Sequence, residues 1–228
     1  MKKSLIYLIC ALFTLLVIQP NINANLSEDD IRTPVNQTTG IPTTNSNTGT
    51  RKIKKKITIC IDPANETQTT NNSSKNINLT ISKLVGQELK RSGFKVVYTR
   101  ENESRPSNSE RLTLAKEKKA DYLLSISTVS DNDSLVKGYS LLTQENAKLI
   151  ELSNHISNEL ASINYSEYQG LDSDHYENFP ILTDKKVPAI LLEIGYISNN
   201  EDLSMLENEE YQNKIASAIC EAFTDTFQ

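Results

Sequence analysis

A single carboxylate, that of Glu193, stands inside an apolar segment that runs from Pro188 to Tyr196. An ionised side chain in such a segment is costly unless it is paired with a partner or used in chemistry. Glu193 is therefore the strongest candidate for a catalytic base in this chain. The alternative is a structural glutamate at a strand end, held in a salt bridge or turned toward solvent, because structural ion pairs produce the same pattern.

Asp62 and Ser127 also follow apolar runs, and the segments that position these three residues alternate between strand and helix spacing. This alternation predicts an α/β fold with a largely parallel sheet and helices on both faces, and sites in such folds form beyond the carboxyl ends of the strands. A capping-box pattern at Ser198 predicts one further helix start. The predicted strands are 57–61, 95–98, 122–127, 138–143 and 189–194, and the predicted helices are 78–91, 109–119, 146–163 and 211–227.

Two appendages precede this folded region. Residues 1–24 combine a basic start, an apolar stretch and a small residue, Ala24, which is the pattern of a secretory signal peptide or of an uncleaved membrane anchor. Residues 25–56 are rich in Ser, Thr, Asn and Pro and end in a basic run, which predicts a disordered polar linker. The folded domain is therefore expected to span residues 57–228, and the chain to be exported, with a possible membrane tether through its first 24 residues.

The charge of the folded region limits its partners. From Ile57 onward, 16 Lys and Arg face 26 Asp and Glu, a formal charge of −10. Binding nucleic acid requires a basic face, so nucleic acid is not an expected partner. Cys60 falls in a predicted strand and Cys220 on the apolar side of the last helix, where they are either two buried free thiols or a disulfide.

An ordered set of short motifs resembles the secreted zinc-dependent N-acetylmuramoyl-L-alanine amidases of bacterial cell-wall turnover and sporulation. The resemblance covers nearly all of residues 57–228. It implies a twisted sheet of about six strands flanked by helices on both faces. The motifs, in chain order, are Asp62-Pro63, Asn78-Leu79, Thr99-Arg100, Arg111-Leu112, Ala120-Asp121, Ser125-Ile126-Ser127, Gly138, Gly170 and Glu193 to Asn199.

The resemblance also implies a zinc ion at the strand ends, held by two histidines and a glutamate. In that family the ion lowers the pKa of a bound water toward about 7 and polarises the scissile carbonyl, while a carboxylate accepts the proton. Glu193 matches the position of this carboxylate. The three ligand positions, however, fall at Asn65, Ser74 and Ser127, whose neutral oxygens are poor zinc ligands. We therefore expect a degenerate member of the family that holds no metal cofactor.

Three hypotheses follow for function. The first is an exported pseudo-enzyme that binds peptidoglycan or a cell-envelope protein, with Asn65, Ser127 and Arg100 as substrate-binding residues around an idle Glu193. It would act outside the cell, in the wall or anchored to the membrane, and the abundance of Lys, Asn and Ile is typical of a low-GC Gram-positive bacterium. A third, purely structural reading leaves the groove unused.

The second hypothesis is an active amidase that hydrolyses the muramoyl-L-alanine bond with a non-standard metal site. Of the two histidines, His155 lies on a predicted amphipathic helix, so His175, in a polar loop, is the one placed to reach the strand ends. The replacement ligands would then be Asp62, Glu66, His175 and Glu193.

Overall fold

The computed structural model describes residues 56–65 and 73–227, and for residues 73–76 the backbone alone. The predicted signal or anchor at residues 1–24, nearly all of the predicted linker and Glu66 lie outside these ranges. Among the helices of the described ranges, none is both long and apolar enough to cross a membrane.

Six strands form one twisted sheet in the order β2-β1-β3-β6-β4-β5. β1 pairs in parallel with β2 and with β3, and β3 in parallel with β6. β4 then runs antiparallel to β6 and parallel to β5. The prediction of an α/β fold with a largely parallel sheet is confirmed. The strands are β1 Thr58–Pro63, β2 Lys95–Tyr98, β3 Tyr122–Val129, β4 Tyr139–Thr143, β5 Tyr168–Asp172 and β6 Ala189–Tyr196.

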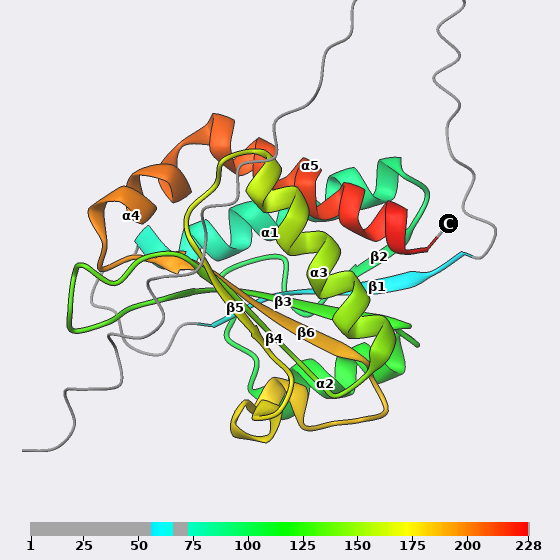
Figure 1. Ribbon diagram of the computed structural model, residues 1–228. Coiled ribbons are helices and arrows are strands. Elements are labelled where there is room, and N and C mark those ends of the chain that lie inside the picture. Colours follow the sequence, from blue (N-terminus) through cyan, green and yellow to red (C-terminus); the bar gives the residue numbers. More distant parts are fainter. Residues whose placement is uncertain (1–55, 66–72, 228) are drawn as a thin grey trace, which may run out of the picture. The chain divides into compact units, whose positions relative to one another are not determined.

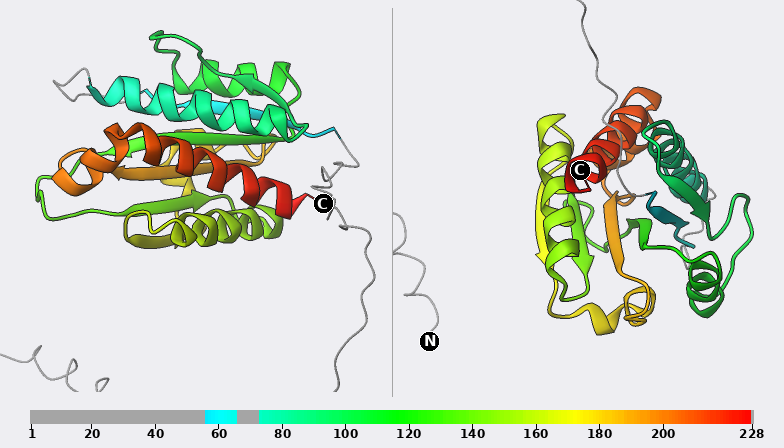
Figure 2. Two further views of the ribbon diagram at one scale, coloured as in Figure 1. Left: turned by 90° about the horizontal axis from the view of Figure 1, so that it is seen from above. Right: turned by 90° about the vertical axis from the view of Figure 1, so that its right-hand side faces the viewer.

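Helices cover both faces of this sheet, as Figures 1 and 2 show. The long helices α1, α3 and α5 lie on one face, and α2 with two short 3-10 turns lies on the other. The described helices are α1 Ser73–Arg91, α2 Asn108–Glu117, α3 Ala147–Ser162, α4 Asn200–Glu207 and α5 Glu209–Thr226, and the 3-10 turns are Tyr176–Asn178 and Pro180–Leu182.

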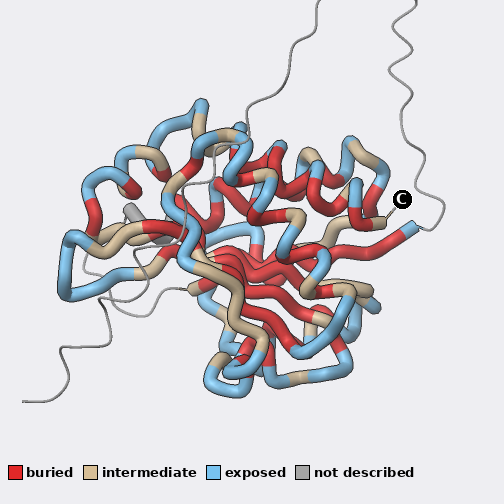
Figure 3. The backbone as a smooth tube through the Cα atoms, in the orientation of Figure 1, coloured by how far each residue is buried: buried red, intermediate tan, exposed pale blue. Residues whose placement is uncertain are grey.

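The central strands are almost entirely buried, which Figure 3 shows as red tube through the middle of the molecule. Successive strand residues point to opposite faces, so the strands β1, β3, β4 and β6 each contribute to two apolar clusters. Ile59 and Ile61 pack under the long helices, whereas Cys60 packs on the α2 side. Cys220 on α5 belongs to the first cluster, and both cysteines are free thiols. Of the two alternatives for this pair, the structure has free thiols, because the sheet separates the two side chains.

Two sequence-based expectations differ from the structure. β5 was not predicted, because its five residues include Gly170 and polar side chains and form an edge strand in which no residue is fully buried. The cap of α4 is Asn199 rather than Ser198. Asn199 Oδ1 accepts the backbone N–H groups of Glu201 at 3.0 Å and Asp202 at 3.2 Å, whereas Ser198 Oγ accepts the N–H of Asp131.

Candidate functional site at the strand ends

Ser127, Glu193 and Ser140 form a row across three neighbouring strands, which we call the strand-end row. Ser127 on β3 is the register partner of Glu193 on β6, and Glu193 is the register partner of Ser140 on β4. Register partners project to the same face of a sheet. The structure therefore places two of the residues singled out in the sequence side by side near the carboxyl ends of β3 and β6, with Ser140 as a third member that the sequence did not indicate.

The Glu193 carboxylate is half-buried and accepts a hydrogen bond from Ser140, with 2.6 Å between Oε2 and Oγ. None of the ion pairs among the described residues includes Glu193. The alternative of a structural glutamate held in a salt bridge therefore has no cationic partner within these residues. Its negative charge adds to burial in raising the pKa of the nearby Tyr196 hydroxyl. A carboxylate held by a hydroxyl on a partly open face is suited to accept a hydrogen bond or a proton from a ligand.

Asp62 is engaged in a buried ion pair. Its carboxylate receives two hydrogen bonds from Arg111, one of them from Nε to Oδ1 at 2.7 Å, and another from the Thr99 hydroxyl. Arg111 also donates to Ser125 Oγ at 3.3 Å. Thus Asp62, Thr99 and Arg111 connect the ends of β1 and β2 to helix α2, and neither carboxylate oxygen of Asp62 is left without a donor.

Arg100 and Asn78 hold the turn that follows β1. The buried Arg100 guanidinium donates to the carbonyl oxygens of Pro63 at 2.7 Å and Ala64 at 3.0 Å. Asn78, buried on α1, donates to the Ala64 carbonyl at 3.4 Å and accepts the backbone N–H of Thr128 at 2.9 Å. These bonds give both residues a positioning role in the shape of the site. A direct contact between Arg100 and substrate stays a prediction.

The residues at the three ligand positions do not form a zinc-binding donor set. Asn65 donates from Nδ2 to the Pro106 carbonyl at 2.6 Å, and its buried Oδ1 has no hydrogen-bond partner within residues 56–65 and 73–227. Ser127 donates from Oγ to the Thr128 carbonyl at 3.0 Å. The backbone of Ser74 lies in the first turn of α1. An amide oxygen and hydroxyls replace imidazole and carboxylate, and within residues 56–65 and 73–227 no group of three His, Cys, Asp or Glu side chains is placed to hold a metal ion.

His175 does not reach the strand-end row. It follows β5 and contacts Asp172, with 3.0 Å between Nδ1 and Oδ2. β4 is antiparallel to β6, and β5 is parallel to β4. The carboxyl end of β5 therefore lies level with the start of β6, away from Glu193. The expected replacement ligands Asp62, His175 and Glu193 are therefore not brought together, and Glu66 lies outside the described residues. The sequence did not reveal the reversed direction of β4 and β5.

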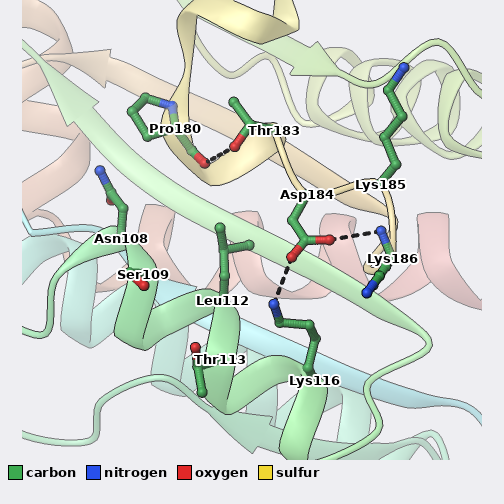
Figure 4. A pocket seen from close by; sticks show the side chains of 10 residues that line it. All are labelled: Asn108, Ser109, Leu112, Thr113, Lys116, Pro180, Thr183, Asp184, Lys185 and Lys186. Carbon is green, nitrogen blue, oxygen red and sulfur yellow. Dashed lines mark hydrogen bonds and ion pairs between the residues drawn. The ribbon is translucent and has the colours of Figure 1, made fainter.

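Two cavities lie on this part of the molecule. One, of about 260 Å³, follows strands β4 and β5 and is lined by Ser140, the hydrogen-bond partner of Glu193. The other, of about 680 Å³, lies between α2 and the Pro180–Leu182 turn. Figure 4 shows the side chains that line this larger cavity. Of the three residues of the strand-end row, Ser140 lines the smaller cavity and none lines the larger one.

Comparison with known proteins identifies the class to which this fold and site belong. The model of the N-acetylmuramoyl-L-alanine amidase family matches residues 59–225. The chain belongs to this family, which confirms the resemblance seen in the sequence. Its domain is a peptidoglycan amidase-family domain.

Bacterial relatives differ in how much of their length this chain matches. Bacillus subtilis YqiI, an uncharacterized protein, is 32% identical over 148 residues, which are 64% of this chain and 70% of YqiI. The B. subtilis amidase LytC is 31% identical over 64% of this chain but only 29% of LytC. The probable cell wall amidase LytH of Staphylococcus epidermidis is 26% identical over 75% of this chain and 58% of LytH.

Solved amidase structures share the fold. The catalytic domain of CwlV from Bacillus (Paenibacillus) polymyxa superimposes with a TM-score of 0.66 at 26% identity, covering 74% of this chain and 97% of that domain. The CwlD amidase of Clostridioides difficile, solved in complex with the GerS lipoprotein, gives a TM-score of 0.62 at 25% identity, covering 75% of this chain and 98% of CwlD.

Proposed function

We propose that this domain binds peptidoglycan outside the cell without hydrolysing it by the zinc mechanism of its family. The observation that carries the proposal is the combination of an amidase fold with neutral side chains at Asn65, Ser74 and Ser127. Neutral amide and hydroxyl oxygens compete poorly for a borderline-soft divalent ion, so the reaction lacks its Lewis acid.

The strand-end row supplies groups for binding. Glu193 accepts hydrogen bonds, and the Ser127 hydroxyl both donates and accepts. In the turn after β1, the buried Oδ1 of Asn65 is an acceptor that has no partner among the described residues. Sugar hydroxyls and peptide amides are the complementary groups of a wall strand. In this role Arg100 and Asn78 act indirectly, because their side chains hold the turn that carries Asn65.

Sedimentation of the purified full chain with insoluble peptidoglycan tests the proposal. We expect the chain to pellet with the wall while no stem peptide is released. Ser127→Trp fills the strand-end row and should lower the bound fraction several-fold, whereas Ser104→Trp, in an exposed loop, should not. Failure of the unaltered chain to bind, or release of stem peptides, contradicts the proposal. Equal binding by Ser127→Trp would show that this surface is not used.

A cell-envelope protein is a second candidate partner. The observation that favours it is the structure of the related CwlD amidase in complex with a lipoprotein. Under this reading the chain would retain the amidase fold as a surface for protein contact. A protein cross-linked to the chain in cells, and not displaced by excess soluble peptidoglycan fragments, would support it.

A further inference from the structure

The larger cavity lies on the same sheet face as the strand-end row. Asn108 lines the cavity and accepts a hydrogen bond from Arg111 Nη1 at 2.6 Å. Arg111 in turn bonds to Ser125, which precedes Ser127 by two residues on β3 and so projects to the same face. We call this cavity the α2 pocket. Its volume of about 680 Å³ lies within the range of small-ligand sites, about 300–1,000 Å³.

The α2 pocket is positive in a domain that is strongly negative. Three lysines and one aspartate line it, a formal charge of +2, against −10 for residues 57–228. Lys116, on α2, forms an ion pair with Asp184, with 2.7 Å between Nζ and Oδ2. Figure 4 shows Asp184 between Lys116 and Lys186. The hydrogen bond from Lys116 holds the pKa of Asp184 below its ordinary value, so this carboxylate is ionised at neutral pH.

Of the three lysines that line the α2 pocket, Lys186 is the one best placed to contact a ligand. Lys116 is paired with Asp184, and the Lys185 ammonium lies 5.4 Å from the centroid of the Tyr176 ring. Lys186 is exposed, and its ammonium group takes part in none of the ion pairs among the described residues, although its charge helps to lower the pKa of Asp184. An exposed ammonium beside a partly neutralised cluster attracts an anion, and the cavity lets that anion approach from one side.

The remaining lining residues favour a peptide carboxylate over a bare phosphate polymer. The hydroxyls of Ser109, Thr113 and Thr183 are suited to peptide N–H and C=O groups. Leu112 and Pro180 provide apolar surface, which fits methyl groups such as those of alanine. A polyol phosphate chain offers no comparable apolar groups.

We propose that the α2 pocket binds a free carboxylate of a peptidoglycan stem peptide, with Lys186 as its principal cationic contact. This inference rests on the proposed function and adds the part of the wall that is recognised. The glycan end of the same wall strand would then lie toward the strand-end row.

Calorimetric titration of the purified full chain with a synthetic stem tetrapeptide that carries free carboxylates tests this assignment. Lys186→Gln should weaken binding about two- to fivefold, the range expected for one exposed ion pair. Lys186→Arg should retain binding, because it keeps the charge. Lys83→Gln, at an exposed position on α1 on the other side of the sheet, is the matched control and should bind like the unaltered chain.

Amidating the carboxylates of the peptide should have the same effect as Lys186→Gln. Unchanged affinity in either experiment overturns the inference, as does tighter binding of poly(glycerol phosphate) than of the peptide. Sedimentation with insoluble peptidoglycan distinguishes a failure of the pocket assignment from a failure of the proposed function. If the unaltered chain binds whole wall but not the peptide, the pocket assignment is wrong and the proposed function stands; if it binds neither, the proposed function is wrong as well.

Discussion

Asp62 and Glu193 both follow apolar runs, yet they have different surroundings. Both oxygens of Asp62 accept hydrogen bonds, and its side chain is fully buried against Arg111. Glu193 is half-buried and accepts one hydrogen bond from the described residues, that from Ser140. At the scale of single residues, the first carboxylate is fully engaged by its hydrogen-bond donors, whereas the second keeps a partly open face.

Removing Asp62 tests this division. Asp62→Ala leaves the Arg111 guanidinium buried without its counter-charge, and we expect a loss of about 3–5 kcal/mol in the free energy of unfolding. Urea denaturation followed by circular dichroism measures it. Asp133→Ala, in an exposed loop, is the control and should change stability by less than about 1 kcal/mol. A small loss for Asp62→Ala would mean that the pair does not stabilise the fold.

At the scale of elements, the turn after β6 leads into α4 through an asparagine cap. Asn199→Ala removes the acceptor for two backbone N–H groups and should lower the free energy of unfolding by about 1 kcal/mol. Ser198→Ala removes one exposed hydrogen bond and should cost less than about 0.5 kcal/mol. Denaturation midpoints of the two variants compare them directly. The opposite ranking would restore Ser198 as the cap.

The elements also show which features could be predicted from the sequence. The three parallel strands β1, β3 and β6 are long apolar runs, so the neighbourhood of Ser127 and Glu193 follows from their pattern and from parallel pairing. β5 lacks such a run, and the antiparallel direction of β4 is a property of the whole sheet. The sequence therefore predicts that His175 can reach the carboxyl ends of β3 and β6, whereas the structure places it at the other end of the sheet, level with the start of β6.

Side-chain partnerships far apart in the chain were harder to predict. The bond between Asp62 and Arg111 spans 49 residues, and the sequence motifs included both residues without linking them. The same holds for Asn78, whose amide bridges Ala64 and Thr128. Only packing of α1 and α2 against the sheet determines these pairs, and local patterns contain no information on it.

At the scale of the whole molecule, burial of ionisable groups makes the free energy of unfolding depend on pH in the alkaline range. Burial, with a smaller contribution from Tyr168, raises the pKa of Tyr139 from 10.0 to about 12. Between these values the unfolded chain loses this proton and the folded chain keeps it, so stability falls as pH rises through that window. Burial raises the pKa of the Cys60 thiol from 9.0 to about 12, with the same sign.

Tyr139→Phe should flatten the decline of stability with pH. The variant loses the hydrogen bond to the Ser157 carbonyl and should be less stable at pH 7 by about 1 kcal/mol, but its stability should fall less steeply above about pH 10. Urea midpoints between pH 7 and pH 11 measure this slope. Tyr211→Phe, at a partly exposed position on α5, should keep the original slope. Equal slopes for all three proteins would argue against a buried, protonated Tyr139.

The chain has the fold of a peptidoglycan amidase, and the proposed function rests on the neutral side chains of Asn65, Ser74 and Ser127 at the positions that the resemblance assigns to zinc ligands. A designed variant provides the positive control for this claim. Asn65→His, Ser74→Glu and Ser127→His together restore two imidazoles and a carboxylate at the three positions, and the resulting chain should take up zinc. The same chain with Ser127→Ala in place of Ser127→His has one ligand fewer and should bind zinc much more weakly.

The zinc content of the purified, unaltered chain is the most direct test of the account. We predict well below one zinc ion per chain after exposure to the metal and removal of excess, because neutral oxygens occupy the ligand positions. One tightly held zinc ion per chain, together with wall hydrolysis that a chelator stops, would contradict the account.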